Sequence, residues 1–205
     1  MFNRNFWLWT ITFLLVFGLS AINPHDYYTW FLEVLPAVLG AVLLLYFRKS
    51  WPVTGLLYVL ILMHCVILMV GGHYTYAEVP YFDDFMSFVW PDRNNYDKLG
   101  HFAQGFVPAM ICREIIIRHE VIQSTGWRRF FIVCFCLALS AFYELIEWWV
   151  ALLSDEAADS FLGAQGYVWD TQSDMFLALI GSVFALVFLS TVHNKQLNNL
   201  KEERS

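Results

Sequence analysis

Residues 97–104 read DKLGHFAQ and open an apolar segment that continues to Ile117. On an α-helix Asp97 and His101 are four residues apart, and His101 and Gln104 are three apart, so all three share one face. An acid, a histidine and an amide that enter a bilayer on one stripe are costly, and by default they indicate a functional site. Other segments of the chain must therefore face this polar stripe.

The composition is that of a polytopic membrane protein with a single domain, residues 1–205. Hydrophobic residues make up 59% of the chain, aromatic residues 19% and charged residues 15%, which is far from the composition of a soluble domain. The twelve Lys and Arg residues are scattered and form no basic patch, which argues against binding of nucleic acid. The expected partner is membrane lipid.

Six apolar segments predict an all-α bundle of six transmembrane helices. The predicted spans are residues 6–22, 30–47, 55–71, 97–117, 130–153 and 170–192. We interpret the first span as a retained helix rather than a cleaved signal peptide, because it is long and five more spans follow. Gly105 and Pro108 predict a kink in the fourth span that frees the carbonyl group of Gln104.

The segments between and after the spans carry three further predictions. Residues 72–96 contain acids and several aromatic residues, which predicts a short helix lying in the membrane interface. Residues 154–169 are predicted to form an acidic loop. Residues 193–205 are polar and are expected to fray.

The distribution of basic residues predicts that both termini are cytoplasmic. Lys and Arg occur near the N-terminus, after the second span, after the fourth span and in the tail. The connections after the first and fifth spans have none, and the connection after the third has only Arg93. This alternation places the three acid-rich loops outside the membrane, with Lys98 at the outer rim.

In this orientation, ionisable residues from three helices reach similar depth in the outer half of the membrane and form a polar core within residues 97–192. They are Asp97, His101, Glu144, Glu147, Asp170 and Asp174. Each carboxylate in the apolar region costs about 2.5–3.5 kcal/mol on insertion scales, so the group needs partners, protons, a cation or a water-filled pocket. The inner half offers only Arg113 and Glu114, near the rim, which argues against a path across the membrane.

The first functional interpretation is an enzyme site. Crowded carboxylates raise one another's pKa, so one can serve as general acid and its neighbour as base. The candidate catalytic residues are His101, Glu144, Glu147 and Asp174. Candidate substrate-binding residues are Lys98, Asp97, Gln104 and Asp170, with Lys98 as an anchor for an anionic headgroup. A divalent cation held by His101, Glu144 and Asp174 is also chemically suitable.

Two other classes of function remain open. Hydrogen-bonded acids in a polar core can hold together a non-catalytic scaffold or regulatory protein. Acids and histidines inside a bundle can also form the proton relay of a coupled transporter, although the outer placement of the polar residues makes this the less favoured alternative.

Three motifs carry a resemblance to known families. The pattern Asp97-Lys98-x-x-His101, the pair Glu144-x-x-Glu147, and Asp174 followed by a glycine seven residues later resemble the VanZ-like superfamily over residues 96–186. The chain as a whole resembles the YjdF family of inner-membrane proteins of enteric bacteria. That resemblance is carried by residues 23–28 (NPHDYY), 71–77 (GGHYTYA) and 96–106 (YDKLGHFAQGF).

The resemblance implies a multi-pass protein of the bacterial inner membrane with a polar site. VanZ-like proteins are associated with low-level teicoplanin resistance, which implies a role at the cell envelope. Two positions depart from the superfamily pattern, which usually has Gln where this chain has Glu147 and Asn where it has Ala178. The function we expect is binding of, or action on, an envelope lipid or lipid-linked precursor at a site open to the outer leaflet.

Overall fold

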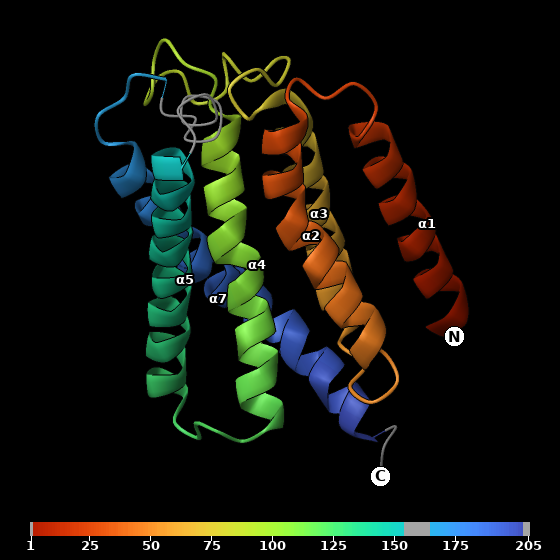
Figure 1. The fold of residues 1–205 in the computed structure, drawn as a ribbon. Coiled ribbons are helices and arrows are strands. Elements are labelled where there is room, and N and C mark those ends of the chain that lie inside the picture. The colour runs from red at the N-terminus through yellow and green to blue at the C-terminus, as the bar shows by residue number, and fades with distance from the viewer. Residues whose placement is uncertain (1, 154–164, 203–205) are drawn as a thin grey trace. The chain divides into compact units, whose positions relative to one another are not determined.

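The computed structural model describes residues 2–153 and 165–202, and these fold into helices without a strand (Figure 1). The helices are α1 (Phe2–Ser20), α2 (Tyr27–Phe47), α3 (Gly55–Tyr74), α4 (Tyr96–Arg118), α5 (Thr125–Leu153) and α7 (Asp170–Glu202). The predicted all-α class is confirmed. Of the predicted acidic loop at 154–169, residues 154–164 lie outside the described residues.

The chain divides into two compact units, which we describe separately. Unit 1 comprises Met1–Tyr46, Leu62–Gly100 and Leu145–Val168. Unit 2 comprises Phe47–Ile61, His101–Glu144 and Trp169–Ser205.

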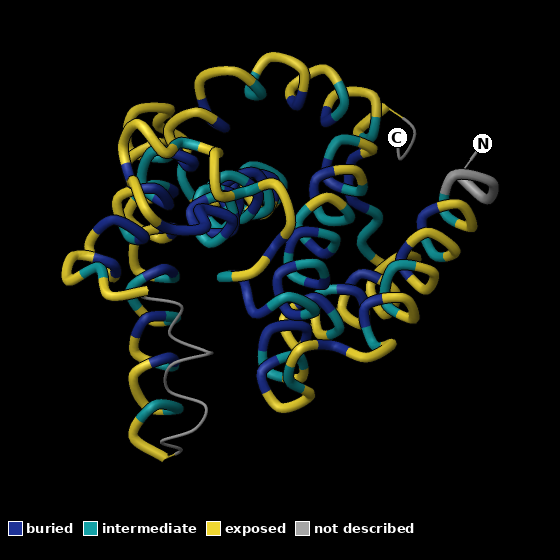
Figure 2. Tube along the Cα trace, turned by 90° about the horizontal axis from the view of Figure 1, so that it is seen from above, coloured by how far each residue is buried: buried dark blue, intermediate teal, exposed yellow. Residues whose placement is uncertain are grey.

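The described helices include four that are long and apolar enough to cross a membrane, namely α2, α3, α5 and α7. In α1 the apolar stretch is shorter, Phe6–Ser20, and α4 does not meet the same criterion. Most turns of α1 are exposed, including Leu8 and Ile11 (Figure 2). Apolar side chains on an outer surface are what contact with lipid requires. The count of six spans and the cytoplasmic placement of both termini stay predictions.

In unit 1, α2 begins directly after a capping residue, Asp26. The Asp26 side chain accepts a hydrogen bond from the Thr29 amide, with Oδ2 2.6 Å from the nitrogen, and its carbonyl accepts one from the Trp30 amide. The bond from the Thr29 amide favours the ionised carboxylate and lowers the pKa of Asp26. The cap moves the start of the helix to Tyr27, three residues before the predicted start at 30.

The connection between α3 and α4, also in unit 1, consists of turns organised by two asparagines. Asn94 donates its side-chain amide to the Val79 carbonyl at 2.8 Å, and Asn95 donates to the Phe85 carbonyl at 2.7 Å. These side chains take backbone carbonyls that a helix would use for its own hydrogen bonds. The prediction of an interfacial helix within residues 72–96 was therefore wrong.

In unit 2, α4 and α7 cross in backbone contact. A β-carbon on Gly105 would overlap the carbonyl group of Ala178, and a β-carbon on Gly181 would overlap the carbonyl group of Phe102. Glycine at both positions lets the two backbones approach this closely. The crossing therefore fixes the spacing of the two helices that carry the outer polar residues.

Unit 2 also contains the connection between α4 and α5 and the long C-terminal part of α7. Residues 119–124 join α4 to α5, so the two helices run antiparallel (Figure 1). Pro108 lies inside α4, so the Gln104 carbonyl lacks its usual amide donor. The helix α7 continues to Glu202, so the prediction that the tail frays was wrong over residues 193–202.

Candidate functional site

The crossing of α4 and α7 brings an imidazole and a carboxylate together in unit 2. His101 lies one turn before Gly105 on α4, and Asp174 lies one turn before Ala178 on α7. Because the two backbones touch at these small residues, the preceding side chains on the same faces converge. His101 Nε2 is 3.9 Å from Asp174 Oδ2.

The third helix at this site is α5, which contributes Glu144. Residues spaced four apart on α5, Ile132, Cys136, Ser140 and Glu144, are all buried, so this stripe faces the interior of the unit. Glu144 Oε1 lies 3.8 Å from His101 Nδ1. The imidazole therefore has a carboxylate beside each ring nitrogen.

The ring of His101 is also oriented by Gln104 on its own helix. Nδ1 lies 3.1 Å from Gln104 Oε1, and because an amide oxygen only accepts, Nδ1 carries the proton of this bond. The carboxylates at 3.8 and 3.9 Å are within ion-pair distance but outside hydrogen-bond distance. His101, Glu144 and Asp174 are each at most 9% exposed, so the charges are poorly screened by water.

Two of the predicted binding residues, Asp97 and Lys98, belong to unit 1. Asp97 Oδ2 is 3.3 Å from Lys98 Nζ and 3.7 Å from Arg93 Nη2. The cationic groups of Lys98 and Arg93 lie near the ring of Tyr167, at 5.9 Å and 5.7 Å from the ring centre, respectively. Lys98 is 1% exposed, so it is buried within the protein, and its predicted position at the outer membrane rim stays a prediction. Its ammonium group is buried beside Asp97 and an aromatic ring.

The remaining predicted residues are Glu147 and Asp170, and both are buried. Glu147 lies on α5 within unit 1, and Asp170 is the first residue of α7 in unit 2, one turn before Asp174. The structure thus brings together His101, Gln104, Glu144 and Asp174 in unit 2, and Asp97 with Lys98 in unit 1.

Sequence reasoning missed a second polar cluster of unit 2, centred on Glu114 and His193. Glu114 Oε2 is 2.9 Å from His193 Nε2, and Arg113 Nη1 is 2.8 Å from His193 Nδ1. A guanidinium group only donates, so Nδ1 of His193 accepts and its Nε2–H donates to the carboxylate. Glu114 and His193 are completely buried in the protein. The predicted position of Arg113 and Glu114 near the membrane rim stays a prediction.

Neighbouring residues complete this inner cluster. Glu114 also accepts hydrogen bonds from Thr54 at 2.8 Å and from Arg118 at 2.8 Å. Arg113 donates to Asn194 as well, so the end of α7 is fastened to α4. In the structure, the buried positions of α7 continue at helical spacing through 185, 186, 193 and 197 into the polar tail. The signal in the sequence is Leu197, an apolar residue eleven positions after Leu186 within that tail.

Comparison with known proteins shows which family the chain belongs to. A family model described as "Predicted membrane protein (DUF2238)" matches residues 5–195. The chain belongs to the DUF2238 family. It is also 48% identical over 188 residues to the inner membrane protein YjdF of Escherichia coli (strain K12), with 92% of this chain and 89% of that protein covered. No solved structure matches the chain.

Membership in the DUF2238 family confirms three predictions. The resemblance to the YjdF family is confirmed by the identity over most of the chain. The location in the bacterial inner membrane and the multi-pass architecture agree with the relative's name, the family description and four spanning-type helices. The VanZ-like resemblance stays a prediction.

Proposed function

We propose that this protein binds an envelope lipid or lipid-linked precursor at the site of His101, Glu144 and Asp174, and that the site opens toward the outer leaflet. The observation that supports the proposal is the imidazole with one carboxylate beside each ring nitrogen, at 3.8 and 3.9 Å. Buried acids and a histidine inside a membrane bundle are costly, and such residues commonly mark a functional site.

The same arrangement suits acid–base chemistry on a bound lipid. A histidine between two carboxylates can take a proton from one side and give it up on the other. His101 would act as the base, Glu144 would share protons with it, and Asp174 would orient the ring. The roles predicted for Asp97, Lys98, Glu147 and Asp170 stay predictions.

A single divalent cation held by His101, Glu144 and Asp174 together is less favoured on geometric grounds. The lone-pair directions of the two ring nitrogens diverge, and each nitrogen faces a different carboxylate. An ion bound to one nitrogen would be near one of the carboxylates and far from the other. A metal at this site therefore requires a turned ring or a different ligand set.

The alternative function is a scaffold whose polar core is held by hydrogen bonds. The inner cluster around Glu114 and His193 has the features of such a structural core. Its hydrogen-bonded groups are 2.8–2.9 Å apart and of complementary charge. The outer site differs, because its carboxylates stand almost 1 Å further from the ring. That difference favours a ligand-binding role for the outer site and a structural role for the inner cluster.

The test compares lipid-dependent stabilisation of wild-type protein with that of Glu144→Gln and Asp174→Asn. Detergent-purified protein is titrated with phosphatidylethanolamine, phosphatidylglycerol or a polyprenyl phosphate, and the thermal unfolding midpoint is recorded. A lipid at a hundred times its Kd stabilises the folded state by about 2.7 kcal/mol, which moves the midpoint by several degrees. We expect at least one lipid to raise the wild-type midpoint and both variants to lose that rise.

Asp84→Asn is the matched control, because Asp84 is an exposed acid of the α3–α4 connection. It should respond to lipid as the wild type does. Equal lipid responses in wild type, Glu144→Gln and Asp174→Asn would refute the proposal. Elemental analysis of the same samples provides a second readout, because a stoichiometric divalent metal lost in both variants would identify a metal site instead.

A further inference from the structure

An arginine buried in unit 2, Arg113 on α4, is hydrogen-bonded to uncharged groups only. It is 5% exposed. Its guanidinium group donates to His193 Nδ1 at 2.8 Å and to the side-chain oxygen of Asn194. His193 accepts through Nδ1 and is therefore a neutral imidazole. A buried guanidinium group is normally paired with an acid, so this arrangement calls for an explanation.

The carboxylate of the same inner cluster is already matched by another cation. Glu114 accepts hydrogen bonds from Arg118 at 2.8 Å and from the Nε2–H of His193 at 2.9 Å. Its contact with Arg113 therefore runs only through the neutral ring of His193. One negative charge stands here against the two positive charges of Arg113 and Arg118.

Two further arginines of unit 2 add to this excess of positive charge. Arg128 and Arg129, in the first turns of α5, lie close enough to act electrostatically on Arg113. The hydrogen bonds of Arg128 are long and again go to uncharged groups, at 3.4 Å to the Ile122 carbonyl and 3.3 Å to the Thr125 hydroxyl. Among the residues that the structure describes, no acid forms an ion pair with any of these three arginines. Like charges that lie close together repel, and a bound anion relieves that repulsion.

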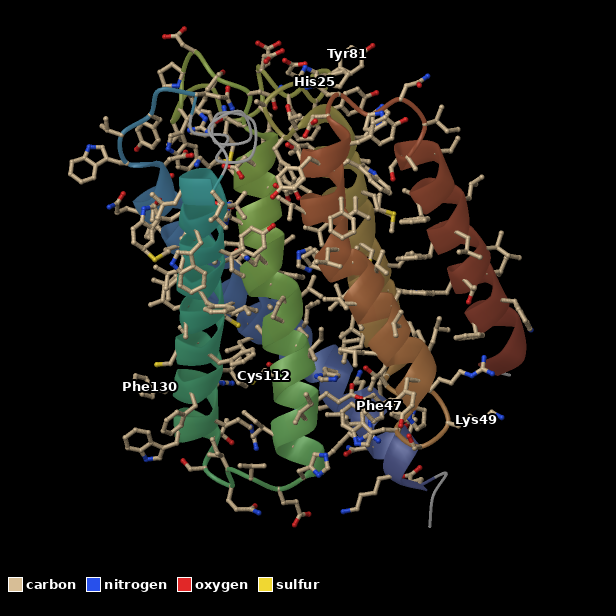
Figure 3. All side chains as sticks on the ribbon, viewed as in Figure 1. His25, Phe47, Lys49, Tyr81, Cys112 and Phe130 are labelled. Carbon is tan, nitrogen blue, oxygen red and sulfur yellow. The ribbon has the colours of Figure 1, made fainter. Side chains whose placement is uncertain are left out.

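The two arginines of α5 are accessible at a surface that has the features of a membrane interface. Arg128 is half-buried and Arg129 is exposed. Trp127 and Phe130 flank them with side chains 61% and 55% exposed, and their rings meet edge to face at 5.8 Å. Phe130 lies at one end of unit 2, together with Lys49 (Figure 3). Exposed tryptophan beside basic residues is typical of the depth at which lipid headgroups lie.

We propose that Arg128 and Arg129 bind the phosphate group of an anionic phospholipid at this end of unit 2, supported by the buried charge of Arg113. A guanidinium group has five N–H donors in a planar fork that fits phosphate oxygens, and Arg128 and Arg129 have donors left for them. Basic residues beside membrane-spanning helices bind anionic headgroups in the same way. The lipid supplies the counter-charge that the described acids do not. This site is separate from that of His101 and does not rest on the proposed function.

The test measures lipid-dependent stabilisation of detergent-purified full-length protein by phosphatidylglycerol and by phosphatidylcholine. Both lipids contain a phosphate diester, but in phosphatidylcholine the choline ammonium cancels its charge. We expect phosphatidylglycerol to raise the thermal unfolding midpoint more than phosphatidylcholine does, and the difference to shrink at high salt. The phosphatidylglycerol concentration needed for half of the rise should increase about fivefold in Arg129→Gln and about 25-fold in the double variant with Arg128→Gln.

Lys49→Gln is the matched control, because Lys49 is an exposed cation at the same end of unit 2, in the α2–α3 connection. It should leave the half-effect concentration within about twofold of wild type, whereas one basic residue in direct contact contributes about fivefold. The midpoint without lipid is a second readout. Arg129 forms no hydrogen bond or ion pair with a described residue, so Arg129→Gln should keep this midpoint or raise it by relieving repulsion with Arg113. An arginine with a purely structural role would lower it.

The outcomes separate this proposal from that for the His101 site. Glu144→Gln should retain the salt-sensitive part of the phosphatidylglycerol response, and complete loss in this variant would overturn the proposal. Unchanged half-effect concentrations in the double arginine variant, or an equal shift in Lys49→Gln, would overturn it as well. Glycerol 3-phosphate is the soluble probe, since a rise equal to that with phosphatidylglycerol would identify a dissolved phosphate and reject the lipid. A response lost only in the arginine variants supports this site and leaves the His101 site without support from this lipid.

Discussion

Two histidines of unit 2 have contrasting surroundings. His193 accepts a hydrogen bond from Arg113 on one nitrogen and donates to Glu114 from the other, both at 2.8–2.9 Å. Its tautomer is fixed and its neighbours are of opposite charge, which is the arrangement of a structural residue. His101 instead has a carboxylate beside each nitrogen at longer distance, 3.8 and 3.9 Å.

We predict that Glu114→Gln strongly destabilises the protein. The carboxylate receives hydrogen bonds from His193, Thr54 and Arg118 in a fully buried position, and its loss leaves the partner cation without a counter-charge. Removing one partner of a buried charge network typically costs about 3–5 kcal/mol. The measurement is the thermal midpoint in detergent, which should fall by roughly ten degrees.

Glu120→Gln is the control for this prediction, because Glu120 is an exposed acid only six residues further along the chain. Its stability should stay within about 0.5 kcal/mol of wild type. Similar midpoints for the two variants would show that the inner cluster does not hold unit 2 together.

At the scale of elements, the crossing of α4 and α7 determines the geometry of the site. The two glycines let the helices touch through their backbones, and the site residues follow one turn away on the same faces. In a membrane, helix pairs cannot rely on the hydrophobic effect for association, so close packing at small residues is a main source of attraction. The backbone contact between α4 and α7 therefore fixes the relative positions of the site residues on these two helices.

We predict that Gly105→Ala and Gly181→Ala each destabilise unit 2 and reduce lipid binding. The added methyl group meets backbone, which cannot rotate away, so the helices must separate. Overpacking of this kind costs about 1–3 kcal/mol or more. The thermal midpoint and its lipid-dependent rise should fall together.

Gly126→Ala provides the matched substitution, because a β-carbon at this position of α5 meets nothing within 4 Å. It should be neutral or stabilise the protein by about 0.4–1 kcal/mol. A wild-type lipid response in Gly105→Ala would show that the crossing does not position the site.

At the scale of the whole molecule, charge placement supports a defined orientation in the membrane. In unit 2, Lys49 and Phe130 lie at the same end (Figure 3). Arg48 is also in the α2–α3 connection, Arg118 ends α4, and Arg128 and Arg129 lie in the first turns of α5. In unit 1, His25 and Tyr81 lie together at one end, in the two connections that have few basic residues (Figure 3). Lys and Arg concentrate on the cytoplasmic side of inner-membrane proteins.

We predict that the α3–α4 connection is periplasmic and the C-terminus cytoplasmic. Alkaline phosphatase fused after Asp83 should be active, and a green fluorescent protein fused after Ser205 should fluoresce, because each reporter works on one side of the membrane. The reciprocal fusions are the controls and should be silent. An inactive phosphatase after Asp83 would reverse the orientation and place the His101 site toward the cytoplasm.

The sequence by itself determined the helical class and most helix boundaries. In lipid every backbone polar group must be bonded within the chain, so a long apolar segment has little choice but to form a helix. Some predicted ends moved by a few residues, as at the Asp26 cap, and the last helix ends at Glu202, ten residues beyond the predicted end at 192. The sequence also predicted that His101, Glu144 and Asp174 lie at similar depth, because a charged residue inside an apolar segment is costly enough to stand out. The structure places both carboxylates within 4 Å of the His101 ring, and their role in a functional site stays a prediction.

Only the tertiary structure decided which polar groups meet. Glu114 and His193 are 79 residues apart, and no local pattern pairs them. Packing in unit 1 buries Lys98 beside Asp97, which its sequence position did not predict. Periodicity specifies the face on which a side chain lies, whereas its partner depends on where two helices cross. In unit 2 that crossing is set by the fit of Gly105 and Gly181 against the opposing backbones.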